Sequence, residues 1–194
     1  MQKINYQKEL LKFMGELQSR PSLLLHCCCA PCASACLELL TTKFNVTCYY
    51  YNPNITSIEE YNKRKAELIK LTKIFNVNLI CEDFNPEPFY SIVKGHEQDA
   101  EGGARCEFCI AERLKKTRNL ASEGGYNYWA TTLTISPHKN SQFINQTGIK
   151  LAGNYLPADF KKNNGFKRSI ELCEKYNIYR QTYCGCEFSL NAKE

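Results

Sequence analysis

The chain has 194 residues, and 43% of them are hydrophobic, which is enough to build an ordinary core without stabilising cross-links. Its formal net charge of +5 is compatible with a polyanionic partner such as RNA, although many basic proteins bind no nucleic acid. No uncharged apolar run approaches the roughly 20 residues needed to span a bilayer, which excludes a membrane-spanning helix. The most unusual feature of the composition is its 12 cysteines.

The amino-terminal region gives the first predicted helix. Residues 4–18 are amphipathic and carry repeated charges. They lack the apolar core and the small-residue cleavage site of a secretory signal, so we expect a cytoplasmic protein. Because disulfides are rare in that reducing compartment, the cysteines indicate metal binding or redox chemistry.

The rest of the chain alternates short apolar segments with longer helical ones. Strands are predicted at residues 23–25, 46–51, 77–81 and 128–133. Helices are predicted at residues 31–43, 57–75, 107–122, 139–149 and 166–176. Pro31 suits a first helical turn, and Ser57 with Glu60 forms a capping box. Residues 82–105 and the tail from residue 184 are predicted to be irregular.

This alternation predicts βαβ units, and therefore an α/β fold with a parallel sheet, right-handed crossovers and a mostly helical carboxy-terminal third. A single domain over residues 1–194 accounts for the length, and no repeat or linker is evident. Open parallel sheets bind ligands beyond the carboxyl ends of their strands. We therefore expect the functional site in the loop that follows the first strand.

The cysteines form three groups that are far apart in the sequence. These groups are Cys27, Cys28, Cys29 and Cys32, then Cys106 and Cys109, then Cys184 and Cys186. The other four stand singly in predicted helices or strands and are expected to be packing residues, namely Cys36, Cys48, Cys81 and Cys173. The first two groups lie at predicted helix starts, where the helix dipole favours thiolates. Their thiolates can converge on a tetrahedral zinc or on a [4Fe–4S] cluster.

The residues leave both kinds of metal centre open. Adjacent thiols are awkward ligands for a single tetrahedral ion but can reach different irons, so the run of cysteines at residues 27–29 favours a cluster. A phosphate-binding function is not supported for this loop, because it has no glycine and no P-loop lysine.

Five sequence blocks, taken together, carry a family resemblance. They are residues 26–32 (HCCCAPC), 51–55 (YNPNI) with Glu60, Tyr61 and Arg64, 105–109 (RCEFC) with Arg113 and Leu114, 131–140 (TTLTISPHKN), and 168–169 (RS) with 179–189 (YRQTYCGCEFS). In this order they resemble the cysteine-rich epoxyqueuosine reductases of the QueH type, over about residues 22–190. The resemblance implies a Rossmann-like fold of the adenine-nucleotide α-hydrolase (HUP-like) type, with cysteines in place of the nucleotide loop.

The same resemblance implies an activity and a cofactor. QueH-type enzymes reduce the epoxide of epoxyqueuosine, at the wobble position of tRNA, to queuosine in the last step of queuosine biosynthesis. An iron–sulfur oxidoreductase with a [4Fe-4S] cluster is therefore expected. A ferredoxin- or flavodoxin-like donor is also expected, because the sequence has no dinucleotide fingerprint. In this hypothesis the cluster relays single electrons while a Lewis-acidic metal or an acidic side chain polarises the epoxide oxygen.

The resemblance also assigns roles to the cysteines. It implies Cys28, Cys29, Cys106 and Cys109 as cluster ligands, because Cys27 occupies a free position of the family pattern, and it leaves Cys32 as either a ligand or a packing residue. Cys184 and Cys186 match a carboxy-terminal pair that is either redox-active or binds a second, mononuclear iron or zinc ion. We expect Asp159 to complete such a site, its alternative being a solvated loop acid.

Substrate contacts are expected from polar, aromatic and cationic side chains in loops near the cysteines. These candidates are Asn52, Asn54, Tyr61, Arg64, His138, Lys139, Arg168 and Arg180. His26 is expected to support the metal ligands, and Trp129 and the tyrosines at residues 49–51 are predicted to be core.

Two other functions fit part of this pattern. A cluster-dependent tRNA-thiolating enzyme of the related ATP-dependent fold should carry a Ser-Gly-Gly-type pyrophosphate loop after the first strand, and this chain does not. A non-catalytic zinc protein that binds RNA would use the same thiols and the same positive charge. Metal analysis distinguishes this last alternative from a reductase.

Overall fold

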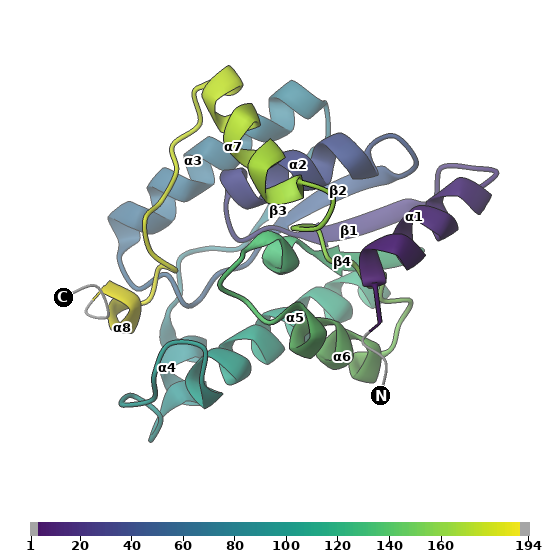
Figure 1. Ribbon diagram of the computed structural model, residues 1–194. Helices are drawn as coiled ribbons and strands as arrows, with labels where there is room; N and C mark the ends of the chain where they lie inside the picture. Colours follow the sequence, from purple (N-terminus) through teal and green to yellow (C-terminus); the bar gives the residue numbers. More distant parts are fainter. Residues whose placement is uncertain (1–3, 191–194) are drawn as a thin grey trace.

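The computed structural model describes residues 4–190 and has a parallel four-stranded sheet at its centre (Figure 1). The strands are β1 (Ser22–His26), β2 (Asn45–Tyr50), β3 (Asn78–Cys81) and β4 (Tyr128–Thr131), in the spatial order β3-β2-β1-β4. His26, the last residue of β1, lies opposite Tyr49 on one side and Thr131 on the other. The strand order reverses between β1 and β4, which makes the carboxyl end of β1 a topological switch point. The predicted parallel α/β fold is confirmed.

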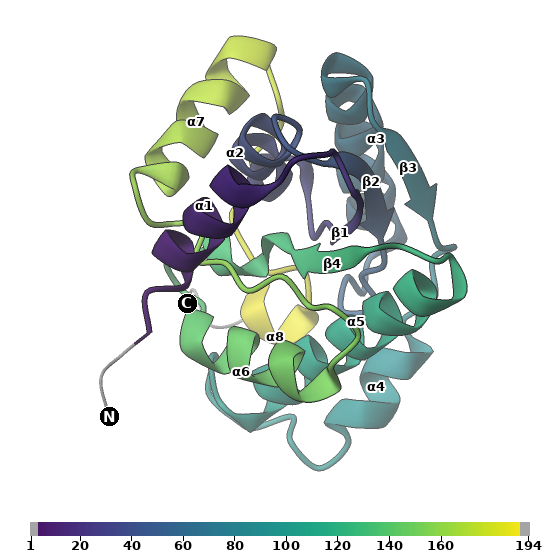
Figure 2. The same ribbon diagram turned by 90° about the vertical axis from the view of Figure 1, so that its right-hand side faces the viewer.

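Helices cover both faces of this sheet (Figure 2). One face carries α1 (Tyr6–Glu16), α2 (Ala30–Leu40), α3 (Ile58–Phe75) and α7 (Gly165–Tyr176). The other face carries α5 (Ala104–Glu123) and α6 (Ser141–Leu151), with α4 (Glu87–Val93) beyond α5. The short α8 (Glu187–Leu190) lies off the carboxyl ends of the strands (Figure 1). A short 3-10 helix, η1 (Thr132–Ile135), follows β4 directly. Within residues 4–190, no helix combines the length and the apolar character that crossing a membrane requires.

The core has two layers because successive side chains of a strand point to opposite faces. Leu23 and Leu25 of β1 pack toward the layer that contains α1 and α2, and Leu24 packs toward α5. A strand that is covered on both faces has no reason to alternate polar with apolar residues, which explains its continuous leucine run. Trp129 and Tyr49 are also buried in the second layer, as predicted.

Local signals set the predicted helix starts. Pro31 lies in the first turn of α2, and the Ser57 hydroxyl accepts a hydrogen bond from the Glu60 backbone N–H at 3.3 Å. Asn76 ends α3 in the left-handed conformation, with φ at 51°.

Two short helices were not expected from the sequence. α4 lies in the segment predicted to be irregular. A helix can form there because Pro88 falls in its first turn, where the missing N–H breaks no helical hydrogen bond. α8 follows the carboxy-terminal cysteines, and its short length leaves little periodic signal. The predicted strand at residues 128–133 is also shorter, because the chain turns into η1 after Thr131.

Candidate metal centre and adjoining cavities

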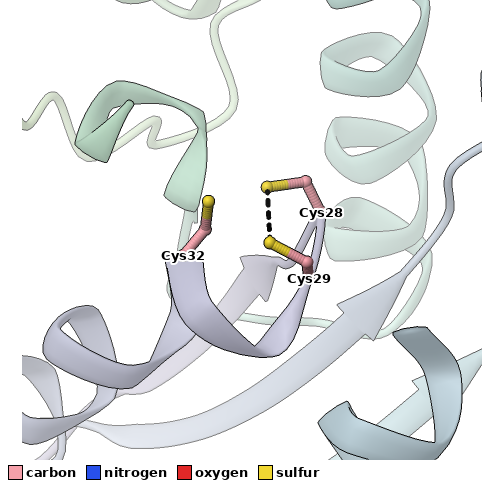
Figure 3. Close-up of side chains that lie close together, drawn as sticks. All are labelled: Cys28, Cys29 and Cys32. Atoms are coloured by element: carbon pink, nitrogen blue, oxygen red, sulfur yellow. Dashed lines mark hydrogen bonds between the residues drawn. The ribbon is translucent and has the colours of Figure 1, made fainter. Parts of the chain in front are cut away.

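Three cysteines meet where β1 runs into α2. The sulfur atoms of Cys28, Cys29 and Cys32, here called the first thiol group, all lie within 4.8 Å of one another. Figure 3 shows them facing one another, with 3.8 Å between the sulfur atoms of Cys28 and Cys29. Cys29 is the N-cap of α2 and Cys32 lies in its first turn, so all three are close to the positive end of the helix dipole.

The local electrostatics favour one thiolate in this group. The pKa of Cys28 lies well below its usual range because Cys29 and Cys32 donate hydrogen bonds to its sulfur, although burial opposes this. Burial raises the pKa of Cys29 to about 12. Three thiolates this close repel one another unless a cation binds them, since metal binding is coupled to loss of the thiol protons. Three sulfur ligands at this spacing, one buried and two half-buried, fit a thiolate-bound metal centre.

The other functional cysteines gather beside this group. Cys106 and Cys109 come from the first turn and a half of α5, and Cys184 and Cys186 from the segment before α8; we call these four the second thiol group. They line a small cavity of about 80 Å³. A main cavity of about 510 Å³ is lined by Cys28, Cys32 and Cys184 among others. Its volume is typical of a small-ligand site.

Cys184 therefore lines both cavities and connects the two thiol groups. Burial raises the pKa of Cys109 to about 12 and also raises the pKa of Cys186, so these thiols keep their protons at neutral pH without a metal. Among residues 4–190, however, only the first thiol group has all its sulfur atoms at ligand spacing. The ligand set implied by the resemblance, Cys28 and Cys29 with Cys106 and Cys109, is divided between the two groups and stays a prediction.

Two cations stand between the thiol groups. Arg113 is only 2% exposed, lines both cavities, and donates from Nε to the Cys109 carbonyl at 3.2 Å. Lys139 also lines both cavities, and the negative charge of a Cys184 thiolate raises its pKa, with Cys28 adding to the effect. These positive charges, one buried and one half-buried, stabilise thiolates and would offset the negative charge of a cluster bound to them.

His26 holds the carboxyl ends of three strands together next to the first thiol group. Its Nδ1 lies 2.9 Å from the Thr131 hydroxyl oxygen, and its Nε2 lies 3.0 Å from the Tyr51 carbonyl oxygen. Because a carbonyl only accepts, Nε2 carries the proton. Burial, helped by the charge of Arg113, lowers the pKa of His26 to about 4, so the ring is neutral at pH 7. Both ring nitrogens are thus occupied in tying β1 to the ends of β2 and β4.

Five of the predicted substrate contacts face the cavities. Asn54 lines the small cavity, Arg64 and Arg180 line the main cavity, and His138 and Lys139 line both. Asn52 instead holds the backbone that follows β1, since its Nδ2 donates to the Cys27 carbonyl at 3.0 Å.

Two other predicted substrate contacts, Tyr61 and Arg168, line neither thiol cavity. Tyr61 is 2% exposed and its hydroxyl donates to the Glu82 carbonyl at 2.7 Å, so it is a core residue of α3. Arg168 of α7 binds Glu38 of α2 through two hydrogen bonds of 2.8 Å and lines neither thiol cavity. The positive charge of Arg168 is balanced there by the carboxylates of Glu38 and Glu171.

Asp159 is also separate from the carboxy-terminal cysteines. Its Oδ2 accepts a hydrogen bond from Ser141 at 3.0 Å, and Lys161 Nζ lies 3.6 Å from its Oδ1. It lines neither thiol cavity, because the chain after β4 brings it to the start of α6. The arrangement therefore gives no basis for Asp159 as a ligand with Cys184 and Cys186.

Two site residues were missed by the interpretation of the sequence. Gln181 donates from Nε2 to the Cys29 sulfur at 2.8 Å, and Glu101 lines both cavities. Gln181 belongs to the block of residues 179–189, so that block was the available signal. Glu101 lies in the segment expected to be irregular, where no local pattern distinguishes it.

The fold and the thiol-lined switch point together define a class of protein, a HUP-like α/β protein with cysteines at the carboxyl end of its first strand. Two solved structures share this fold at 12% sequence identity. The U34-tRNA thiolase NcsA from Methanococcus maripaludis, solved with its [4Fe-4S] cluster, has a TM-score of 0.62 over 95% of this chain and 67% of that one. NMN synthetase from Francisella tularensis has a TM-score of 0.53 over 93% of this chain and 75% of that one.

The sequence then identifies the family. The model of epoxyqueuosine reductase QueH matches residues 23–192. Epoxyqueuosine reductase QueH of Streptococcus pyogenes serotype M1 is 44% identical over 97% of this chain and 79% of its own length. The protein of the same name from Thermotoga maritima is 35% identical over 87% of this chain and 90% of its own length. The chain belongs to the epoxyqueuosine reductase QueH family.

Proposed function

We propose that this protein reduces the epoxide of epoxyqueuosine in tRNA to queuosine with a thiolate-bound [4Fe-4S] cluster. The observation that carries the proposal is the first thiol group, whose three sulfur atoms lie within 4.8 Å of one another beside a cavity of about 510 Å³. Relatives up to 44% identical bear the name of this activity. The thiolase NcsA carries a [4Fe-4S] cluster on the same fold.

The first thiol group would hold the cluster, and Cys106 and Cys109 stay the predicted source of a further ligand. When bound, the cluster supplies electrons one at a time from an external donor, for which we propose a ferredoxin- or flavodoxin-like protein. Removal of the epoxide oxygen as water also takes protons. His138 and Glu101 line both cavities and are the titratable groups placed to deliver them.

The substrate would enter through the main cavity. The modified base is far smaller than tRNA, and enzymes that act on a nucleobase take it out of the stack and into a pocket. Lys139 and Arg180 line this cavity and offer positive charge to the phosphates that flank such a base. Cys184 lies at the junction of the two cavities, where it can act with Cys186 as a redox pair or bind a second metal ion.

The test is anaerobic purification followed by iron, sulfide and zinc analysis, and then reaction with epoxyqueuosine-containing tRNA and a strong reductant. We expect about four irons per chain with matching sulfide, and conversion of the nucleoside to queuosine. Zinc without sulfide, together with an unchanged epoxide, would contradict the proposal and favour a zinc-binding RNA-binding protein instead.

A further inference from the structure

The segment that carries Cys184 crosses the carboxyl edge of the sheet without belonging to it. Residues 179–186, here called the thiol strap, run from the end of α7 past α3 to α8 (Figure 1). This segment has no regular secondary structure. The position of the Cys184 thiol between the two cavities must therefore depend on particular contacts to the strap.

Arg64 of α3 makes the main contact. Its Nη1 donates to the Cys184 carbonyl at 2.9 Å and its Nη2 donates to the Tyr183 carbonyl at 3.2 Å. Its Nε donates to Glu60 at 2.6 Å, one helical turn earlier. Arg64 is only 3% exposed, and each of its guanidinium nitrogens donates to a group of this chain. A phosphate of a substrate would have to displace these partners, so the geometry favours a role toward the strap.

The loop after β2 holds the same point of the strap from another direction. The Thr56 N–H donates to the Gly185 carbonyl at 3.3 Å, and Asn54 Nδ2 lies 3.4 Å from the Cys184 carbonyl oxygen. Gly185 has φ at +120°, and a Cβ there would lie 2.9 Å from Ile55 Cγ1 and 3.1 Å from Arg64 Nη1. Only glycine allows this approach, which explains the residue between the two cysteines.

We propose that Arg64 is a positioning residue, which clamps the backbone at residues 183–184 and so fixes the Cys184 thiol at the junction of the two cavities. The planar guanidinium can bind two adjacent carbonyl groups at once while Glu60 balances its charge, and a lysine cannot reproduce this geometry. The clamp matters for epoxide reduction only if the proposed function is correct, but the position of the thiol does not depend on that function.

The experiment measures the alkylation rate of each cysteine by mass spectrometry in reduced, metal-free protein. In Arg64→Gln and Arg64→Lys we expect Cys184 to react about tenfold faster, because loss of two charge-assisted hydrogen bonds frees the strap. Cys36 and Cys48 should keep their rates, since they lie in the core. Unchanged rates at Cys184 in both variants would overturn the proposal.

Arg20→Gln is the matched control. Arg20 also donates to two backbone carbonyls, those of Thr41 and Phe44, but it precedes β1 and is at the opposite end of the sheet. Its loss should leave the alkylation of Cys184 unchanged. Faster alkylation of Cys184 in this control would mean that general loosening, and not the clamp, controls the thiol.

A second variant changes the strap itself and leaves the charge of Arg64 on α3 in place. Gly185→Ala should accelerate alkylation of Cys184 as Arg64→Gln does, and combining the two should add less than the sum of their separate effects. Fully additive effects would contradict a shared clamp.

In enzyme loaded with its metal centre, Arg64→Gln should lower kcat but cause no further loss in a Cys184→Ser background. A raised KM with unchanged kcat and unchanged alkylation would indicate a phosphate contact instead. Faster alkylation of Cys184 in an enzyme that never reduces epoxyqueuosine would leave the clamp intact and reject the proposed function.

Discussion

Each thiol of the first group has a neighbour that holds it in place. The Cys28 N–H donates to the Thr132 hydroxyl at 3.3 Å, and Gln181 donates to the Cys29 sulfur at 2.8 Å. Cys32 is held by the helical turn itself. Hydrogen bonds to ligand sulfur atoms are among the factors that set the potential of an iron–sulfur cluster. Gln181, which comes from the distant thiol strap, would therefore link the position of the strap to the potential of a cluster bound by Cys29.

The structure predicts that Cys32 is a metal ligand. In Cys32→Ser we expect anaerobically prepared protein to lose most of its iron, because a serine hydroxyl is a poor ligand for the iron of a cluster. Iron and sulfide analysis with the visible absorbance measures this. Cys36→Ser is the control, since Cys36 lies one turn further along α2, is fully buried, and donates only to the Cys32 carbonyl. Equal iron content in both variants would show that Cys32 is a packing residue.

The ion pair between Glu38 and Arg168 gives a pH-dependent contribution to stability. Hydrogen bonds from Arg168 lower the pKa of Glu38 in the folded state. A lowered folded pKa means that the stabilisation is present above the unfolded pKa and is lost as pH falls through the folded pKa. Both side chains are about two-fifths exposed, at 42% and 41%, so solvent screens the pair and we expect its contribution to be small.

Urea unfolding of metal-free protein checks this contribution. At pH 7 the wild type should exceed Glu38→Gln in free energy of unfolding by a small amount, and the difference should shrink as the pH falls below the usual glutamate pKa and vanish only below the lowered pKa of the folded state. A difference that grows on acidification would contradict the sign.

At the level of elements, helix α6 packs unusually close to the segment that follows it. A Cβ at Gly148 would overlap the ring of Tyr155, which packs against Trp129 in a tilted arrangement with ring centroids 4.5 Å apart. The Tyr155 hydroxyl also donates to Asn145 at 3.0 Å, so the ring cannot move without losing that bond. The glycine allows α6 to cover the Trp129 layer of the core.

Gly148→Ala should therefore destabilise the protein by about 1–3 kcal/mol, because the buried ring must shift. Gly15→Ala is the matched helical control, since a Cβ at Gly15 meets nothing within 4 Å. That change should be neutral or stabilising by up to about 1 kcal/mol, since alanine favours helix. Thermal unfolding followed by circular dichroism compares the two. A neutral Gly148→Ala would mean that Tyr155 can repack freely.

For the whole molecule, the sheet provides a rigid frame and the candidate metal centre lies at the carboxyl ends of its strands. β1 is buried on both faces, whereas the thiol strap has no strand partner. A metal that binds the folded state but not the unfolded chain stabilises the fold through mass action. Metal removal should act most strongly on segments that border the candidate centre and lack regular secondary structure.

We therefore expect anaerobic chelation to lower the melting temperature and to speed amide hydrogen exchange in residues 179–186, with little change in β1. Hydrogen exchange read by mass spectrometry measures both regions in one experiment. Exchange that accelerates equally in β1 and in the strap would show that the metal stabilises the whole fold and not the strap in particular.

The sequence by itself determined the sheet, the longer helices and the presence of cysteines where the first strand ends. The leucine run at residues 23–25, Pro31 at a helix start and the Ser57 cap act over a few neighbouring residues, so they could be interpreted without the fold. The alternation of strands and helices then predicts a parallel sheet, and the loop after its first strand predicts the place of the site. Short α4 and α8 were missed because their periodic signals are weak.

Only the tertiary structure decided which side chains meet. Gln181 reaches Cys29 across 152 residues of sequence, and Arg64 reaches Cys184 across 120. Asp159 was expected beside the carboxy-terminal thiols but lies at the start of α6, because the path of the chain after β4 takes it there. Residue type and local pattern specify what a side chain can do. Its partners depend on the packing of distant segments, which no local pattern specifies.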